Sequence, residues 1–381
     1  MPSRDRIRSN RKILLDLSGW HGDSGKKYNE RKKFQEAAIP TVSPEASLAT
    51  RAAWLSFVGG YTQGQIAARL GVSAVKVHRL IAQARQLGLV KVFVEGAPVE
   101  CIEAEDVLAR RFGLRFCTVV PNMTAAAPEA EDSARTIAAL GAAGARFLAG
   151  YLEQDNAKLI GVGHGRTLAA IADQLPTIPR PDHRFVSLIG SLTRRAATNP
   201  FDVIHRLAER TGGEGYFLPV PFIADSVEAK QVLMAQQSVR AIVKLAREAE
   251  MFMVGIGELG AEAHMKQVGQ LTAAEYSALR EAGAVGDLIG HFLDAEGRPV
   301  DCEVNDRTLG LRIEDLRDRE VIAVAGGAGK RDAILAALRS GVITGLITDE
   351  VAAQQIVALE RDARSTATTA AGSGSAGRRT A

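Results

Sequence analysis

"LIGVGHGRT" (159–167) is the stretch that most directly indicates the fold: a short apolar run, closely spaced glycines, and a threonine at which a helix can begin. A run of this kind, bounded by glycine and followed by a helical pattern, is typical of a buried strand in a parallel sheet. Similar runs occur at residues 184–192, 249–257, 319–327 and 345–349. Because these runs alternate with amphipathic helical segments, they predict an α/β domain with a doubly wound, mostly parallel sheet.

The glycine loops are candidates for a binding site, because open parallel sheets bind ligands beyond the carboxyl ends of their strands. Glycines let backbone amides approach a ligand, and a helix start favours an anion or a polyhydroxylated ligand. "AVAGGAGKRDAI" (323–334) has the same pattern and adds Lys330, although a purely structural lysine is the alternative. Asp287 could accept hydrogen bonds from two hydroxyls, or it could be a structural strand-end aspartate. The predicted effector-binding residues are Gly163, His164, Gly165, Arg166, Thr167, Asp287, Gly326, Gly327 and Lys330.

Motifs of the common enzyme and cofactor classes are incomplete in this sequence. Arg166 stands where a dinucleotide fingerprint needs its third glycine, and Val324 and Arg331 replace two required P-loop residues. No nucleophile elbow or HExxH helix occurs. The cysteines argue against a disulfide framework or a zinc site and fit a reducing compartment, because they form no CxxC pair and are far apart: Cys101, Cys117 and Cys302. We therefore predict no catalytic residue, no metal and no cofactor.

"YTQGQIAARLGVSAVKVHRL" (61–80) predicts two short helices separated by a tight turn. Thr62 and Gln65 have the spacing of a capping box, Gly71 allows the turn, and Ser73 can cap the next helix. A preceding helix over 44–58 and strand residues in "GLVKVFVEG" (88–96) would complete a winged helix-turn-helix unit. A helical hairpin with a charged, solvated face is the alternative. The predicted DNA-binding residues are Thr62, Gln63, Ser73, Ala74, Lys76, His78 and Arg79.

Composition divides the 381 residues into four segments. Residues 1–45 form a basic arm, which we expect to be disordered, although it could touch DNA phosphates. Residues 46–98 are the expected DNA-binding domain, residues 99–362 the effector-binding domain, and residues 363–381 a small, polar, disordered tail. The sequence contains no apolar run of about 20 residues and no recognisable secretory signal, so we expect a cytoplasmic protein without a membrane partner.

The order of several motifs resembles that of the SorC family of bacterial sugar-sensing transcriptional regulators over residues 46–362. The segments that carry the resemblance are "YTQGQIAARLGVSAVKVHRLIAQARQLGLV", "GVGHGRTL", "GIGEL", "GDLIGHFLDAEGRPV", "AVAGGAGKRDAILAALRSG" and "GLITDE". Within that family, "RAAWLSFVGG", "RFVSLIGSLTR" and "NPFDVIHRLAERTG" make the sequence most similar to the erythritol catabolism regulators. The resemblance implies an effector domain with the fold of ribose-5-phosphate isomerases that binds its ligand without converting it. It also implies that the effector contacts the residues selected above.

The combined prediction is a repressor of a polyol or sugar catabolic operon. Its expected partners are operator DNA and a sugar, a polyol or a phosphorylated form of either, and we expect a homodimer or homotetramer on a pseudo-palindromic operator. Two other classes stay open at this point. One is a sugar-phosphate isomerase-like or kinase-like enzyme with an accessory helical domain. The other is a non-specific chromosome-associated protein that uses the basic arm.

Overall fold

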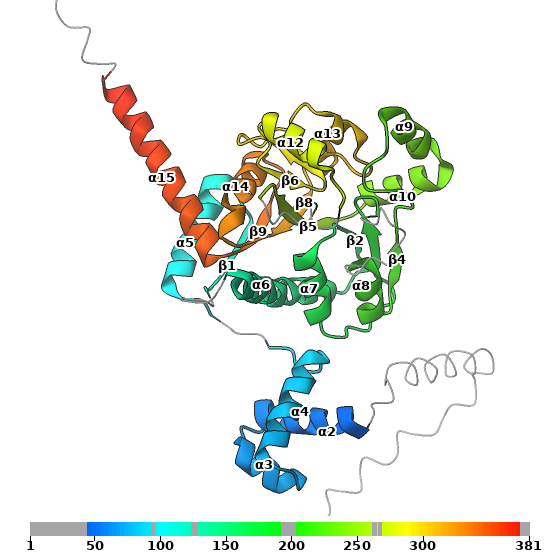
Figure 1. The fold of residues 1–381 in the computed structure, drawn as a ribbon, viewed down its shortest axis with the longest axis vertical. Coiled ribbons are helices and arrows are strands. Elements are labelled where there is room, and N and C mark those ends of the chain that lie inside the picture. Colours follow the sequence, from blue (N-terminus) through cyan, green and yellow to red (C-terminus); the bar gives the residue numbers. More distant parts are fainter. Residues whose placement is uncertain are drawn as a thin grey trace, which may run out of the picture. The chain divides into compact units, whose positions relative to one another are not determined.

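The computed structural model describes residues 44–92, 96–122, 129–191, 203–260, 265 and 269–373. The chain divides into two compact units between Val90 and Lys91, and each unit is described by itself. Figure 1 shows the elements of both units in sequence colours. Apart from the first two residues of a helix that begins at Pro44, the basic arm expected over residues 1–45 lies outside the described residues.

The smaller unit is a bundle of short helices with its own core. It consists of α2 (Pro44–Ala53), a π-helical turn η1 (Trp54–Val58), α3 (Gln63–Leu70) and α4 (Ala74–Gln86). The core residues are small or branched and come from all three α-helices: Ala49, Ala52, Ala53, Ile66, Val77, Leu80 and Ala84. Val58, the last residue of the helix expected over residues 44–58, lies in the π-helical turn and is 69% exposed. The wider turn changes the phase of these final residues relative to the α-helix before them.

The turn between α3 and α4 has the predicted capping interactions. Thr62 accepts a hydrogen bond from the Gln65 amide, while the Gln65 side chain accepts one from the Thr62 amide, which confirms the capping box. Gly71 ends α3 in the left-handed conformation (φ 64°), and Ser73 caps α4 by accepting from the Lys76 amide at 3.2 Å. The strand expected over residues 88–96 is not seen: residues 88–92 and 96 form none, and residues 93–95 lie outside the description.

The larger unit is built on a parallel sheet with the strand order β1-β9-β8-β5-β2-β3-β4. The five predicted apolar runs are the central strands β2 (Leu159–Val162), β3 (Arg184–Ser187), β5 (Met251–Glu258), β8 (Glu320–Val324) and β9 (Gly345–Asp349). Sequence analysis missed the two edge strands, β1 (Phe116–Val120) and β4 (Glu214–Tyr216). A short antiparallel hairpin, β6 (Gly286–Leu288) and β7 (His291–Leu293), pairs with the carboxyl end of β5.

Helices cover both faces of this sheet, which confirms the doubly wound architecture. One face packs against α6 (Glu129–Leu152), α7 (Arg166–Gln174) and α8 (Val203–Thr211). The other packs against α5 (Val99–Phe112), α10 (Gln237–Arg247), α14 (Arg331–Arg339) and α15 (Glu350–Ser373). Alternate residues of β5 belong to the two cores, as a strand buried on both sides requires: Met251 and Met253 to one, Phe252 and Val254 to the other.

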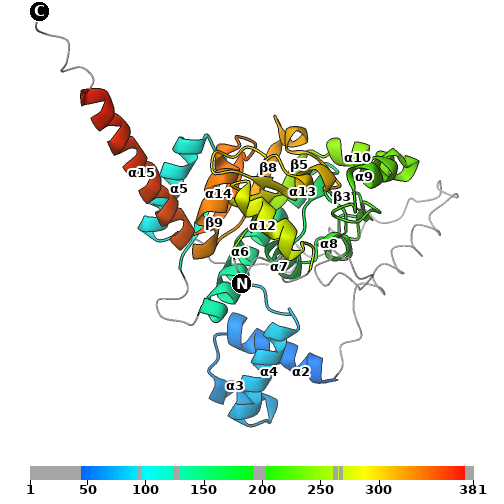
Figure 2. The same cartoon turned by 45° about the horizontal axis from the view of Figure 1, so that its top comes forward.

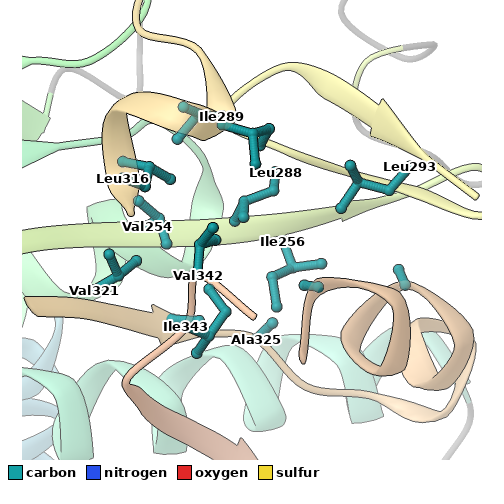
Figure 3. Close-up of a cluster of buried hydrophobic side chains, with 14 of the residues drawn as sticks. Val254, Ile256, Leu288, Ile289, Leu293, Leu316, Val321, Ala325, Val342 and Ile343 are labelled. Atoms are coloured by element: carbon teal, nitrogen blue, oxygen red, sulfur yellow. The ribbon is translucent and has the colours of Figure 1, made fainter. Parts of the chain in front are cut away.

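The core on the second face extends under the hairpin. Figure 3 shows Val254 and Ile256 of β5 in the same apolar cluster as Leu288 of β6. Three further helices, α9 (Val227–Ala235), α12 (Ala273–Glu281) and α13 (Glu303–Arg307), surround this region, and α5 lies beside α15 in both views (Figure 1, Figure 2). Helix α15 continues to Ser373, past the boundary at residue 362 suggested by composition. Among the described helices, none is both long and apolar enough to cross a membrane.

Candidate functional site

The strand order determines where a ligand can bind in the larger unit. From β2 the sheet extends through β3 and β4 in one direction, whereas β5 pairs with the opposite side of β2 and is followed by β8 and β9. The winding therefore changes direction between β2 and β5, and ligands of such sheets bind at the carboxyl ends of the strands at this point. A cavity of about 530 Å³ lies there, and its volume suits a small organic ligand.

The loop after β2 forms one wall of the cavity. Gly165 is the residue that caps α7, and its φ of 125° is a conformation that side-chain-bearing residues rarely adopt. Arg166 and Thr167 begin the helix beside it, so that their backbone amides and side chains lie at the positive end of α7. His164 Nε2 donates to the Ser187 hydroxyl at 3.0 Å, because that hydroxyl itself donates to the Ile189 carbonyl at 2.6 Å. The histidine ring is thereby fixed at the cavity wall.

The loop after β8 forms the opposite wall. The Gly327 amide donates to Asp349 Oδ1 at 2.7 Å, which ties this loop to the end of β9. Lys330 lies in the short helix η3 (Ala328–Lys330), and its ammonium donates to the Ile256 carbonyl at 2.7 Å. Burial lowers the pKa of Lys330 and Arg166 lowers it further, whereas Glu258 and Asp287 act in the opposite direction. The loop thus presents a basic side chain that is held in position by the central strand β5.

Asp287 lies on β6, opposite Gly257 of β5, and is almost fully buried. Burial raises the pKa of its carboxyl to about 6, although the Gly290 amide, which donates to Oδ2 at 3.1 Å, and Lys330 favour the charged form. A Cβ atom on Gly257 would overlap Oδ1 of Asp287. The missing side chain at residue 257 is therefore what allows this carboxylate to lie against the backbone of β5.

All nine residues selected for effector binding line this one cavity, although they come from three separate parts of the sequence. Sequence analysis missed several other lining residues, among them Glu258, Asp349, Asn122, Ser133 and Thr136. Glu258 and Asp349 end strands β5 and β9. Like Asp287, they are carboxylates that can accept hydrogen bonds from hydroxyl groups, and they lie at the carboxyl ends of strands, where such sheets bind ligands. The residues of α6 carry no such signal, because nothing in the sequence indicates that this helix reaches the cavity. His291, on β7, is buried and donates to the Leu311 carbonyl.

In the smaller unit, all seven residues selected for DNA binding are exposed. They lie at the start of α3 and in or just before the first two turns of α4, where Val77 is the buried residue. Arg69, in the last turn of α3, packs over the Tyr61 ring at 4.1 Å and adds a further cation to this unit. The unit therefore presents polar and cationic side chains at the helix that enters the major groove in helix-turn-helix proteins.

The chemistry of the cavity is that of recognition by hydrogen bonds. It combines two cations, three carboxylates, a histidine and the amides of two glycine loops, so it can satisfy a ligand that carries several hydroxyls or an anionic group. Within the described residues, no group of three or more histidine, cysteine or acidic side chains is arranged to hold a metal ion. A helix-turn-helix unit followed by an α/β unit with such a cavity defines the class of ligand-responsive transcriptional regulators.

Comparison with known proteins gives the family. A family profile described as "Putative sugar-binding domain" matches residues 97–358. The erythritol catabolism regulatory protein EryD of Brucella abortus (strain 2308) is 43% identical over 311 residues, which are 82% of this chain and 96% of that protein. The transcriptional regulator LsrR of Enterobacter sp. (strain 638) is 30% identical over 342 residues, covering 88% of this chain and 99% of that one. The chain belongs to the SorC family of sugar-binding transcriptional regulators.

Solved structures show the same architecture. The full-length sorbitol operon regulator SorC from Klebsiella pneumoniae has a TM-score of 0.59 at 24% identity, covering 83% of this chain and all of that one (100%). A DeoR family transcriptional regulator from Listeria monocytogenes has a TM-score of 0.60 at 25% identity, covering 67% of this chain and 99% of that chain. Because the relatives are transcriptional regulators, this chain is a regulator and not an enzyme.

Because Asp287 lies against Gly257, alanine substitution should affect stability differently at Gly257 and at Gly255. Gly257→Ala should lower the free energy of unfolding by about 1–3 kcal/mol, because the added methyl group displaces a buried carboxylate. Gly255→Ala is the matched control, since its Cβ would lie 3.5 Å from the nearest atom, the His164 carbonyl oxygen. Urea denaturation of both variants measures the effect. Equal stability of the two variants would contradict the steric role of Gly257.

The raised pKa of Asp287 predicts how stability depends on pH. Between the ordinary pKa of 3.8 and the folded value of about 6, the folded chain binds a proton that the unfolded chain has released. The contribution of Asp287 to stability should therefore fall as pH rises through this window, by up to about 3 kcal/mol, and level off above it. Denaturation at a series of pH values, with Asp287→Asn as reference, isolates this contribution. If the free energies of unfolding of the wild type and of Asp287→Asn differed by the same amount at every pH, Asp287 would make no such contribution.

Proposed function

We propose that the protein is a repressor of a polyol or sugar catabolic operon of the erythritol type, and that the cavity ligand controls its binding to DNA. The observation that carries the proposal is the meeting of all nine selected residues in one cavity at the point where the winding of the sheet changes direction. The erythritol assignment rests on the 43% identity to EryD, whose name states a role in erythritol catabolism.

The effector class follows from the donors and acceptors around the cavity. Asp287, Glu258 and Asp349 can accept hydrogen bonds from hydroxyl groups, while Arg166 and Lys330 can donate to hydroxyls or to a phosphate. A polyol offers both kinds of partner at each carbon atom, and an open-chain sugar does so at each carbon except the carbonyl. We therefore take the effector to be a short polyol, a sugar or a phosphorylated form of one, and the experiment below separates the free polyol from its phosphate.

The proposed DNA-binding surface consists of Thr62, Gln63, Ser73, Ala74, Lys76, His78 and Arg79. Two copies of this surface, about 34 Å apart or a multiple of that distance, would match two half-sites of a pseudo-palindromic operator. We propose a homodimer or homotetramer for this reason, acting in the cytoplasm on chromosomal DNA. A ligand that binds one arrangement of subunits better than the other would shift the population toward or away from the DNA-competent one.

The direct test is binding of the purified chain to DNA upstream of its own operon, at fixed salt, with and without erythritol or erythritol phosphate. We expect sequence-specific binding that one of these ligands changes. Gly165→Val should retain DNA binding but lose this response, because the new side chain blocks the approach of the ligand to the backbone at the start of α7. Gly341→Val is the control, since Gly341 also has a positive φ (72°) but lies away from the cavity. A normal response in Gly165→Val would refute the assigned site.

The DNA-binding surface makes a separate prediction. Lys76→Ala and Arg79→Ala should each weaken operator binding by about 1–3 kcal/mol, because each removes a cation that can contact phosphate or a base edge. Arg110→Ala removes the same charge from an exposed helix of the larger unit and should leave operator affinity unchanged. Fluorescence anisotropy with labelled operator gives the three affinities. Equal losses in all three variants would indicate non-specific attraction of DNA to positive charge.

A further inference from the structure

Val75, the second residue of α4, is 66% exposed, and it is the one large apolar residue exposed within α3 or α4. The other exposed large apolar residues described in the smaller unit lie in η1 or after α4. Successive residues of an α-helix are about 100° apart, so Val77 is about 200° and Leu80 about 140° round from Val75. Both of those residues are buried in the core of the unit. Val75 therefore points directly away from the core, at the centre of the outer face of α4.

The outer position of Val75 has no explanation within the smaller unit. Valine is a weaker helix former than alanine, and an exposed isopropyl group gains nothing from water. Its neighbours on the exposed side of α4 are cationic or polar: Lys76, His78 and Arg79. A single apolar side chain surrounded by such residues fits a partner that is negatively charged overall but carries a local apolar group. Duplex DNA has this chemistry, because thymine places a methyl group in the major groove.

We infer that Val75 contacts the C5-methyl group of a thymine in each operator half-site and thereby contributes to base selection. The inference rests on the proposed role of α4 as the helix that reads DNA. The first turn of a recognition helix is the part that approaches the base edges, and apolar contact is the interaction by which proteins recognise the thymine methyl group. Lys76, next to Val75, and Arg79, one turn further on, can contact phosphates or base edges, which would hold Val75 at the floor of the groove.

The experiment uses the full chain and operator duplexes selected from a randomised DNA library. Each thymine of the selected site is replaced in turn by deoxyuridine, which lacks only the methyl group. We expect about fourfold weaker binding of the wild-type protein at one position in each half-site, the size of effect that one buried methyl group gives. Val75→Ala should bind thymine and uracil duplexes equally at that position. The variant should fold normally, because alanine favours helix and the replaced side chain is exposed.

Leu87→Ala is the control, because Leu87 is also an exposed apolar residue but follows the last turn of α4. It should keep the preference for thymine. If wild-type protein binds both duplexes equally at every position, or if Val75→Ala keeps the preference, the contact does not exist. Failure to select any sequence from the library would instead overturn the proposed DNA-binding function itself, and the contact with it.

Discussion

The parallel pairing of β5 with β2 on one side and β8 on the other is the constraint on which the ligand site depends. This pairing brings the loops after β2 and β8 to opposite sides of one cavity. It also lets the far end of β5 pair with β6, which carries Asp287 to the same place. The Lys330 ammonium then donates to the carbonyl of Ile256 on β5 itself. A shift in the register of β5 would move Glu258, and Asp287 on the paired strand β6, relative to Lys330.

The polar groups of this cavity are already held by the protein before a ligand arrives. Asp287 accepts from the Gly290 amide, Asp349 accepts from the Gly327 amide, and His164 is fixed by the Ser187 hydroxyl. Groups fixed in this way lose little conformational entropy on binding, so the affinity for a ligand with matching hydroxyls is increased. Such an arrangement suits a sensor, whose task is to distinguish one small molecule from others of similar size.

Much of the fold and of the candidate site could be predicted, because the relevant signals are local. The central strands are short apolar runs, the turn between α3 and α4 needs Gly71, and the glycine loops follow the strands that position them. The edge strands were missed for a physical reason: β4 is only three residues long, and two of the three are exposed. Val75 was not selected because the candidates for DNA contact, apart from Ala74, were chosen for side chains that form hydrogen bonds, although its angular distance from Val77 and Leu80 already places it outside.

The pairing of β1 with β9 has a consequence for biosynthesis. The first strand of the larger unit takes its place beside the last one, more than 200 residues later in the chain. At about 5–20 residues per second, the ribosome delivers β9 on the order of 10 s or more after β1. The smaller unit needs no such partner, since its core comes entirely from residues 49–84. A nascent regulator can thus complete its helix-turn-helix while the sheet that is to sense the ligand is still missing an inner strand.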